Sequence, residues 1–137
     1  MMTLKISEKE LKIKFGYEPT LKTRLLSRMA KMGVEMQENS DGMETIENML
    51  LFIPDVLLVG LQKEHKDEFG YNLDTKEGYE EQKEKVFSLV AEHLDSGEVD
   101  AVDFFNELQE EMTRNGFLKK MFEREVEKAA EQAKAKN

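Results

Sequence analysis

The 137-residue chain has no cysteine, two histidines and two prolines, and its eight glycines are scattered singly. Without cysteine, thiol catalysis, disulfide bonds and thiolate zinc sites are excluded. His65 and His93 lie too far apart in sequence to form a histidine metal motif. No glycine-rich phosphate-binding motif is present. The sequence therefore lacks most of the short motifs that indicate a catalytic, metal-binding or phosphate-binding site.

The many acidic residues form no catalytic or metal-binding pattern either. The stretch DSGEVDAVD, residues 95–103, has the acidic character of a calcium loop. However, Gly97 and Val99 stand where oxygen ligands are needed, and Asp100 stands where the loop requires glycine. Carboxylate pairs on one helical face are expected by number alone among 29 acidic residues. We therefore expect a protein that is not an enzyme and has no metal or cofactor.

The most apolar stretch, MLLFIPDVLLVGL at residues 49–61, is too short to cross a membrane. A spanning helix needs about 20 apolar residues. The first residues, MMTLKISEKELK, also lack the order of charged, apolar and small residues that a signal peptide has. From both observations we expect a soluble protein that is made in the cytoplasm and has no membrane partner.

Charge is unevenly distributed along the chain, whose net charge is −9. Residues 1–36 contain eight basic and four acidic residues, residues 37–111 contain five and 21, and residues 112–137 contain seven and four. The acidic balance argues against a general nucleic-acid binder, which needs basic residues to neutralise phosphates. The basic ends and acidic middle would suit head-to-tail self-association, although a solvated acidic surface is the simpler explanation.

Alternation of apolar and polar residues predicts an N-terminal β-hairpin within residues 3–15. A hairpin alone is marginally stable in water, so its apolar face should pack on the helices that follow. Residues 18–33 are predicted to form one amphipathic helix, with Pro19 near its start and Gly33 just past its end.

Residues 43–61 are predicted to contain two helix ends that meet at Pro54. In the polar loop before them, residues 35–42, Ser40 or Asp41 can cap the first helix. Pro54 should end that helix, because proline has no N–H and disfavours an α conformation in the residue before it. The second piece is apolar nearly all round, so it should lie at the centre of the core or in a core shared with a partner.

Three further helices are predicted in the second half of the chain. Asp74 or Thr75 is a candidate cap for a long helix that ends near Leu94. Asp100 is a candidate cap for the next helix, which the Asn-Gly pair at 115–116 should break. The last helix loses its apolar residues toward its end, so that end should fray or extend from the body.

These elements predict a mainly α (α+β) protein in which a short hairpin precedes a bundle of about five to six helices. Its length suits one domain with a single core. We place this domain at residues 1–126 and a polar helical or frayed tail at residues 127–137.

Methionine is the one residue type that hints at a partner, because its flexible side chain suits adaptable surfaces. Nine methionines are present, although filling the core is the simpler role for most of them. Within residues 43–61 we select five candidate partner-binding residues, of which Leu57 and Leu61 should belong mostly to the core. The five are Met49, Phe52, Val56, Leu57 and Leu61.

The order of these features resembles the tail assembly chaperones of long-tailed bacteriophages that infect Gram-positive bacteria. The resemblance extends from about residue 3 to about residue 123. It includes LKIKFGYEPTLKTRLL, ENMLLFIPDVLLVGLQKEH and VFSLVAEHLDSGEVDAVDFFNELQEEMTRNGFLKKMF. The hairpin that leads into FGY at residues 15–17 contributes most, together with the segment marked by Pro54, Leu57, Leu58, Gly60 and Leu61.

The resemblance implies a non-enzymatic protein of the host cytoplasm that is absent from the mature virion. It would bind and solubilise the tape measure protein and help recruit subunits of the tail tube protein. A homo-oligomer is compatible with this role. In many family members a ribosomal frameshift adds a C-terminal extension, and the polar end EKAAEQAKAKN is compatible with such a junction.

Two other functions are compatible with the composition. The acidic segment 37–111 could mimic DNA and inhibit a DNA-binding protein, but the apolar stretch at residues 49–61 interrupts its charges. A small helical adaptor protein is the other alternative.

Overall fold

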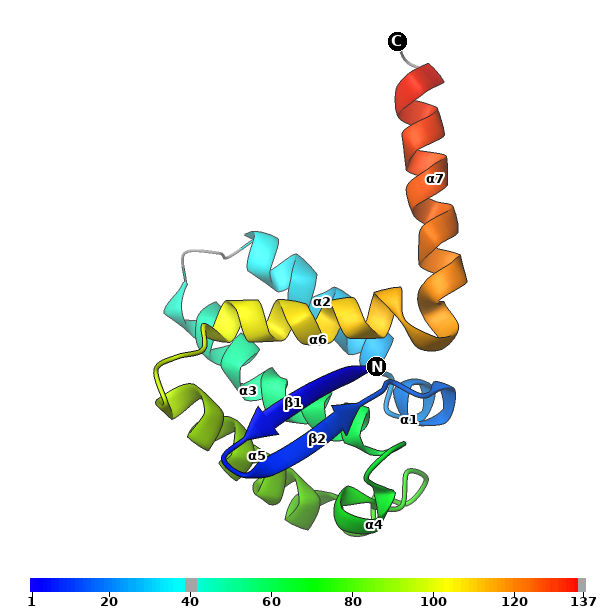
Figure 1. Cartoon of the computed structure of the whole chain (residues 1–137). Helices are drawn as coiled ribbons and strands as arrows, with labels where there is room; N and C mark the ends of the chain where they lie inside the picture. Colours follow the sequence, from blue (N-terminus) through cyan, green and yellow to red (C-terminus); the bar gives the residue numbers. More distant parts are fainter. Residues whose placement is uncertain (39–41, 136–137) are drawn as a thin grey trace.

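The computed structural model describes residues 1–38 and 42–135, and 71% of the chain is helical. An N-terminal hairpin precedes seven α-helices in this described part, as Figure 1 shows. This confirms the predicted mainly α (α+β) fold. The elements are β1 Met2–Ile6, β2 Lys9–Ile13, α1 Tyr17–Lys22, α2 Leu25–Glu38, α3 Met43–Leu61, α4 Lys66–Phe69, α5 Tyr79–Asp95, α6 Ala101–Arg114, the 3₁₀ turn Gly116–Leu118 and α7 Lys119–Ala135.

Strands β1 and β2 form an antiparallel hairpin that packs on the helices, as the sequence predicts (Figure 1). Ile6 pairs with Lys9, which leaves a two-residue turn whose first residue, Ser7, has a φ of 56°. Leu4 and Ile6 of β1 and Leu11 and Ile13 of β2 are buried. Beyond β2, the Lys14 N–H donates a hydrogen bond of 3.0 Å to the Gly60 carbonyl, which joins the hairpin to α3.

Helix α3 is the centre of the core. It contacts α1, α2, α4, α5, α6 and β2, and its second half is buried on every side. The predicted break at Pro54 is wrong, because α3 continues through this residue as one helix. Pro54 cannot donate a hydrogen bond to the Leu50 carbonyl, and this loss weakens the helix locally. The buried apolar residues on both sides of Pro54 hold the two halves together, so tertiary packing outweighs the local cost.

The first predicted helix is in fact two helices. Arg24, with a φ of 55°, interrupts the chain between α1 and α2. At the end of α1 the Pro19 carbonyl accepts from both the N–H and the hydroxyl of Thr23, at 3.3 and 2.7 Å. Gly33 does not end α2, which continues to Glu38. The proposed caps Ser40 and Asp41 lie outside the described residues.

The caps of α5 and α6 differ in how well the sequence predicts them. Helix α5 begins after Gly78, whose φ is 86°, and neither Asp74 nor Thr75 caps it. Instead, the Thr75 hydroxyl accepts from the Glu77 N–H within the preceding loop. Asp100 caps α6 as predicted, since its carboxylate accepts from the N–H groups of Val102 and Asp103 at 2.9 and 3.1 Å.

Helix α7 extends away from the body, as expected for the end of the chain (Figure 1). Gly116, with a φ of 74°, marks the predicted break after α6, and Leu118 is the last buried side chain among residues 1–132 whose burial the structure describes. Side chains from Lys119 to Gln132 are exposed. In the part of the chain that the structure describes, no helix is long and apolar enough to span a membrane.

Candidate partner-binding groove

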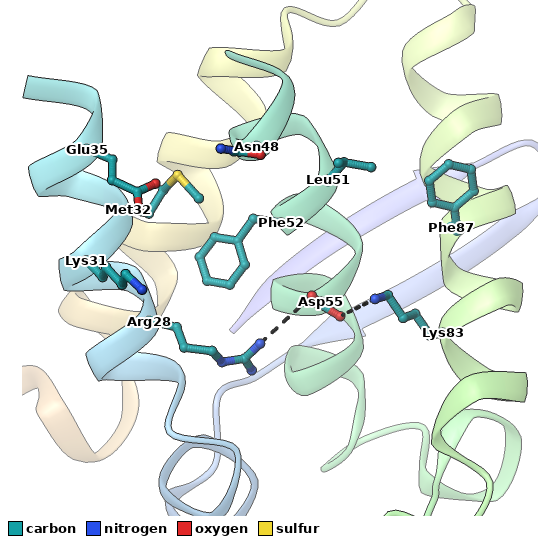
Figure 2. Close-up of a pocket in the computed structure, with 10 residues that line it drawn as sticks. All are labelled: Arg28, Lys31, Met32, Glu35, Asn48, Leu51, Phe52, Asp55, Lys83 and Phe87. Carbon is teal, nitrogen blue, oxygen red and sulfur yellow. Dashed lines mark ion pairs between the residues drawn. The ribbon is translucent and has the colours of Figure 1, made fainter. Parts of the chain in front are cut away.

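A groove of about 550 Å³ lies over the first half of α3, with α2 on one side and α5 on the other. We call it the α3 groove. Figure 2 shows how its side chains come from these three helices. It is lined by Arg28, Lys31, Met32 and Glu35 of α2, by Asn48, Leu51, Phe52 and Asp55 of α3, and by Lys83 and Phe87 of α5.

The floor of the α3 groove is apolar and partly open to solvent. Leu51 is 51% exposed and lies on the side of α3 that faces Phe87, which is 50% exposed (Figure 2). Phe52 is buried beside α2, where the Arg28 guanidinium lies 5.6 Å from its ring. Leaving two such large apolar side chains half in water costs free energy, because each loses hydrophobic burial. This surface is therefore suited to binding an apolar face.

Asp55 links the three helices at one end of the α3 groove. Its carboxylate accepts a hydrogen bond of 2.7 Å from the Tyr79 hydroxyl of α5. Arg28 of α2 lies 3.8 Å from one carboxylate oxygen, and Lys83 of α5 lies 3.7 Å from the other. Figure 2 shows Arg28 and Lys83 approaching Asp55 from opposite sides. One carboxylate thus holds both walls of the groove against its floor.

Two tyrosines beside Asp55 have raised pKa values. Burial raises the pKa of Tyr79, and the hydrogen bond to Asp55 raises it further. Burial also raises the pKa of Tyr71, whose ring packs edge-on against Tyr79 with centroids 5.3 Å apart. The Tyr79 hydroxyl therefore stays protonated at neutral pH and remains a hydrogen-bond donor to Asp55.

The five residues selected from the sequence are all buried in the core. Val56, Leu57 and Leu61 have no exposed surface, and Met49 is 2% exposed. A partner could contact these four side chains only if the helices separated. Their role in binding therefore stays a prediction, because these side chains are not accessible in this conformation. Phe52 is the exception, because it is 8% exposed and lines the α3 groove. Of the five, Phe52 alone lines the groove.

The residues that surround Phe52 in the groove were not predicted from the sequence. Leu51 was not selected, although it directly precedes Phe52 in the same apolar stretch. Phe87 interrupts the polar face of α5, and this was the one signal that could have identified it. Asp55, Arg28 and Lys83 carry no such signal, because charged residues are abundant throughout the chain.

No metal site accompanies the groove within residues 1–38 and 42–135, where no three histidine or carboxylate side chains come together. His65 has a structural role, since its Nε2 accepts a 2.8 Å hydrogen bond from the Lys12 N–H. The interactions available at the α3 groove are thus hydrophobic contacts bordered by ion pairs.

Comparisons with models of protein families, with curated proteins and with solved structures found no match for this chain.

Proposed function

We propose that this protein is a phage tail assembly chaperone that binds the tape measure protein through the α3 groove. It would keep this client soluble in the host cytoplasm, help recruit tail tube subunits, and be absent from the mature virion. The observation that carries the proposal is the half-exposed apolar pair formed by Leu51 on the groove floor and Phe87 on the α5 wall. The sequence resemblance to the chaperone family supplies the identity of the client.

A tape measure protein is a long helical client, and amphipathic helices commonly bind in apolar grooves between helices. The α3 groove fits this mode, because its floor is apolar while Arg28, Lys31, Glu35 and Lys83 border it. Apolar side chains at helical spacing would cover Leu51 and Phe87, and the polar face of the client would remain in water. Several chaperone molecules along one repeated client would bind with higher avidity than one.

Co-expression with the tape measure protein encoded in the same genome tests the proposal. We expect the client to stay soluble and to elute with the chaperone on size exclusion. In the Leu51→Asp and Phe87→Asp variants, the client should be insoluble, because a carboxylate in the groove would be desolvated by the bound helix. Both residues are half-exposed, so both variants should keep the fold.

Val102→Asp is the matched control. Val102 is 46% exposed and lies at the start of α6, outside the α3 groove, so this variant should behave as the unmodified protein. An insoluble client with the unmodified protein would contradict the chaperone role. A soluble complex with Leu51→Asp and with Phe87→Asp would contradict the groove as the binding site.

Substitutions at Leu57 and Leu61 are unsuitable for this test. Both side chains are fully buried, so Leu57→Asp or Leu61→Asp would place a charge in the core and unfold the protein. Lost client binding in these variants would report on folding and not on the interface. Circular dichroism of each variant identifies such a loss of structure.

A further inference from the structure

A pocket rich in positive charge adjoins the α3 groove where α1 meets α2. We call it the basic pocket, and its volume is about 500 Å³. Five of its lining residues are cations, namely Lys22, Arg24, Arg28, Lys31 and Lys76, and none is acidic. Such a concentration is unexpected on a chain with a net charge of −9. The local potential should therefore attract anionic groups, against the repulsion of the whole molecule.

Three of the five cations have no acidic partner within the described residues. Lys22 lies 2.9 Å from Glu18 and 2.8 Å from Asp74, and Arg28 lies 3.8 Å from Asp55. Arg24, Lys31 and Lys76 form no ion pair in the part of the chain that the structure describes. Three positive charges are thus left for a ligand to neutralise.

The backbone conformation of two of these cations is a further observation that favours a bound partner at the basic pocket. Arg24 and Lys76 have φ values of 55° and 67°, a region that costs a non-glycine residue about 1–2 kcal/mol. Strained backbone conformations cluster at binding sites, where the surrounding contacts hold them.

The basic pocket and the α3 groove are adjacent, because Arg28 and Lys31 line both. At the other end of the groove lie Glu35 and Asn48 (Figure 2). A helix that lies in the groove therefore passes from this end toward the cations of the basic pocket. Side chains that project from the bound helix at that end would approach the basic pocket, which Arg24 and Lys76 line.

We propose that the basic pocket binds glutamate or aspartate side chains of the segment that occupies the α3 groove. The partner is then an amphipathic helix with acidic residues beside its apolar face. This inference rests on the proposed binding role of the groove and adds the charge that the client must carry. A protein segment is favoured over nucleic acid, because an apolar groove adjoins the pocket and the molecule as a whole is acidic.

Two synthetic helical peptides test this inference by fluorescence anisotropy. Both are about 20 residues long and share one apolar stripe, and they carry either glutamate or glutamine beside one end of it. We expect the glutamate peptide to bind about tenfold more tightly at about 50 mM salt, and the difference to shrink at about 500 mM salt. The double variant Arg24→Glu/Lys76→Glu should bind both peptides equally.

Lys119→Glu/Lys120→Glu on α7 is the control with the same change in net charge, and it should keep the preference for glutamate. Equal binding of the two peptides to the unmodified protein would overturn the inference. A preference that survives in Arg24→Glu/Lys76→Glu would overturn it as well. A single-stranded oligonucleotide that binds more tightly than the glutamate peptide, and is lost in the same variant, would replace the protein partner with nucleic acid.

The proposed groove is tested separately by the glutamine peptide, which lacks the acidic residues. If Leu51→Asp does not weaken its binding, the groove is not the site, whatever the charge preference. If Leu51→Asp abolishes its binding while glutamate and glutamine peptides bind alike, the groove stands and the inference about the basic pocket fails.

Discussion

Gly60 is the residue at which the backbone of α3 touches the hairpin. A Cβ atom at this position would lie 2.7 Å from Cγ2 of Ile13 and 3.1 Å from Cζ of Phe15. Both neighbours are buried and cannot move away freely. We expect Gly60→Ala to lower the free energy of unfolding by about 1–3 kcal/mol through overpacking. Urea denaturation followed by circular dichroism measures this loss.

We expect Gly33→Ala to change the free energy of unfolding in the opposite direction. Gly33 lies inside α2, and a Cβ atom there would meet no atom within 4 Å. Alanine should therefore raise the free energy of unfolding by about 0.5–1 kcal/mol, because glycine is a poor helix former. If Gly60→Ala were as harmless as Gly33→Ala, the close contact between α3 and the hairpin would be contradicted.

The sequence shows which residues are apolar but not which of them a neighbouring element covers. Leu51 and Leu57 both belong to the apolar stretch of α3, yet Leu51 is half-exposed and Leu57 fully buried. The difference depends on where the hairpin, α5 and α6 pack around α3, and no local pattern contains this information. For this reason only Phe52 among the five selected residues lines the α3 groove, whereas the half-exposed Leu51 and Phe87 were not selected.

The helices differ in how far local signals determine their ends. Asp100 was predicted to cap α6 because its carboxylate can accept hydrogen bonds from free N–H groups one turn ahead, and it does so. The signals at Gly33 and Pro54 were misleading, because the flanking residues are held in α2 and α3 by buried side chains such as Met29 and Ile53. Packing outweighs propensity in these two helices.

We expect Asp100→Ala to lower the free energy of unfolding by about 1 kcal/mol, because two N–H groups at the start of α6 lose their acceptor. Asp100→Asn should be close to neutral, since asparagine caps helices about as well as aspartate. Thermal and urea unfolding of the two variants measure the difference. Equal stability of Asp100→Ala and the unmodified protein would show that the cap contributes nothing.

The whole molecule consists of a core around α3 and one helix, α7, that leaves it. The fold class was predictable because the alternating and helical periods are strong in most segments. The packing of the hairpin and of helices α1, α2, α4, α5 and α6 around α3 was not, since it depends on contacts between distant parts of the chain. The predicted division at residue 126 stays a prediction, although side chains from Lys119 to Gln132 are exposed.

Removal of residues 127–137 should leave the stability of the body within about 0.5 kcal/mol of the full chain, because the described side chains of this segment bury little surface. By contrast, Leu118→Ala should cost about 2–4 kcal/mol, since Leu118 is 4% exposed and anchors the start of α7 to the core. Differential scanning calorimetry compares the two. A strongly destabilised truncation would place the tail within the cooperative unit.

The contacts of Asp55 affect the entropy that is lost when a ligand binds in the α3 groove. Tyr79, Arg28 and Lys83 all meet its carboxylate, so α2 and α5 are held at fixed positions relative to α3. A receptor whose walls are already in place loses little conformational entropy when a ligand enters. The Asp55 contacts are therefore a form of preorganisation. Less of the free energy of hydrophobic contact in the groove is then lost to ordering the receptor.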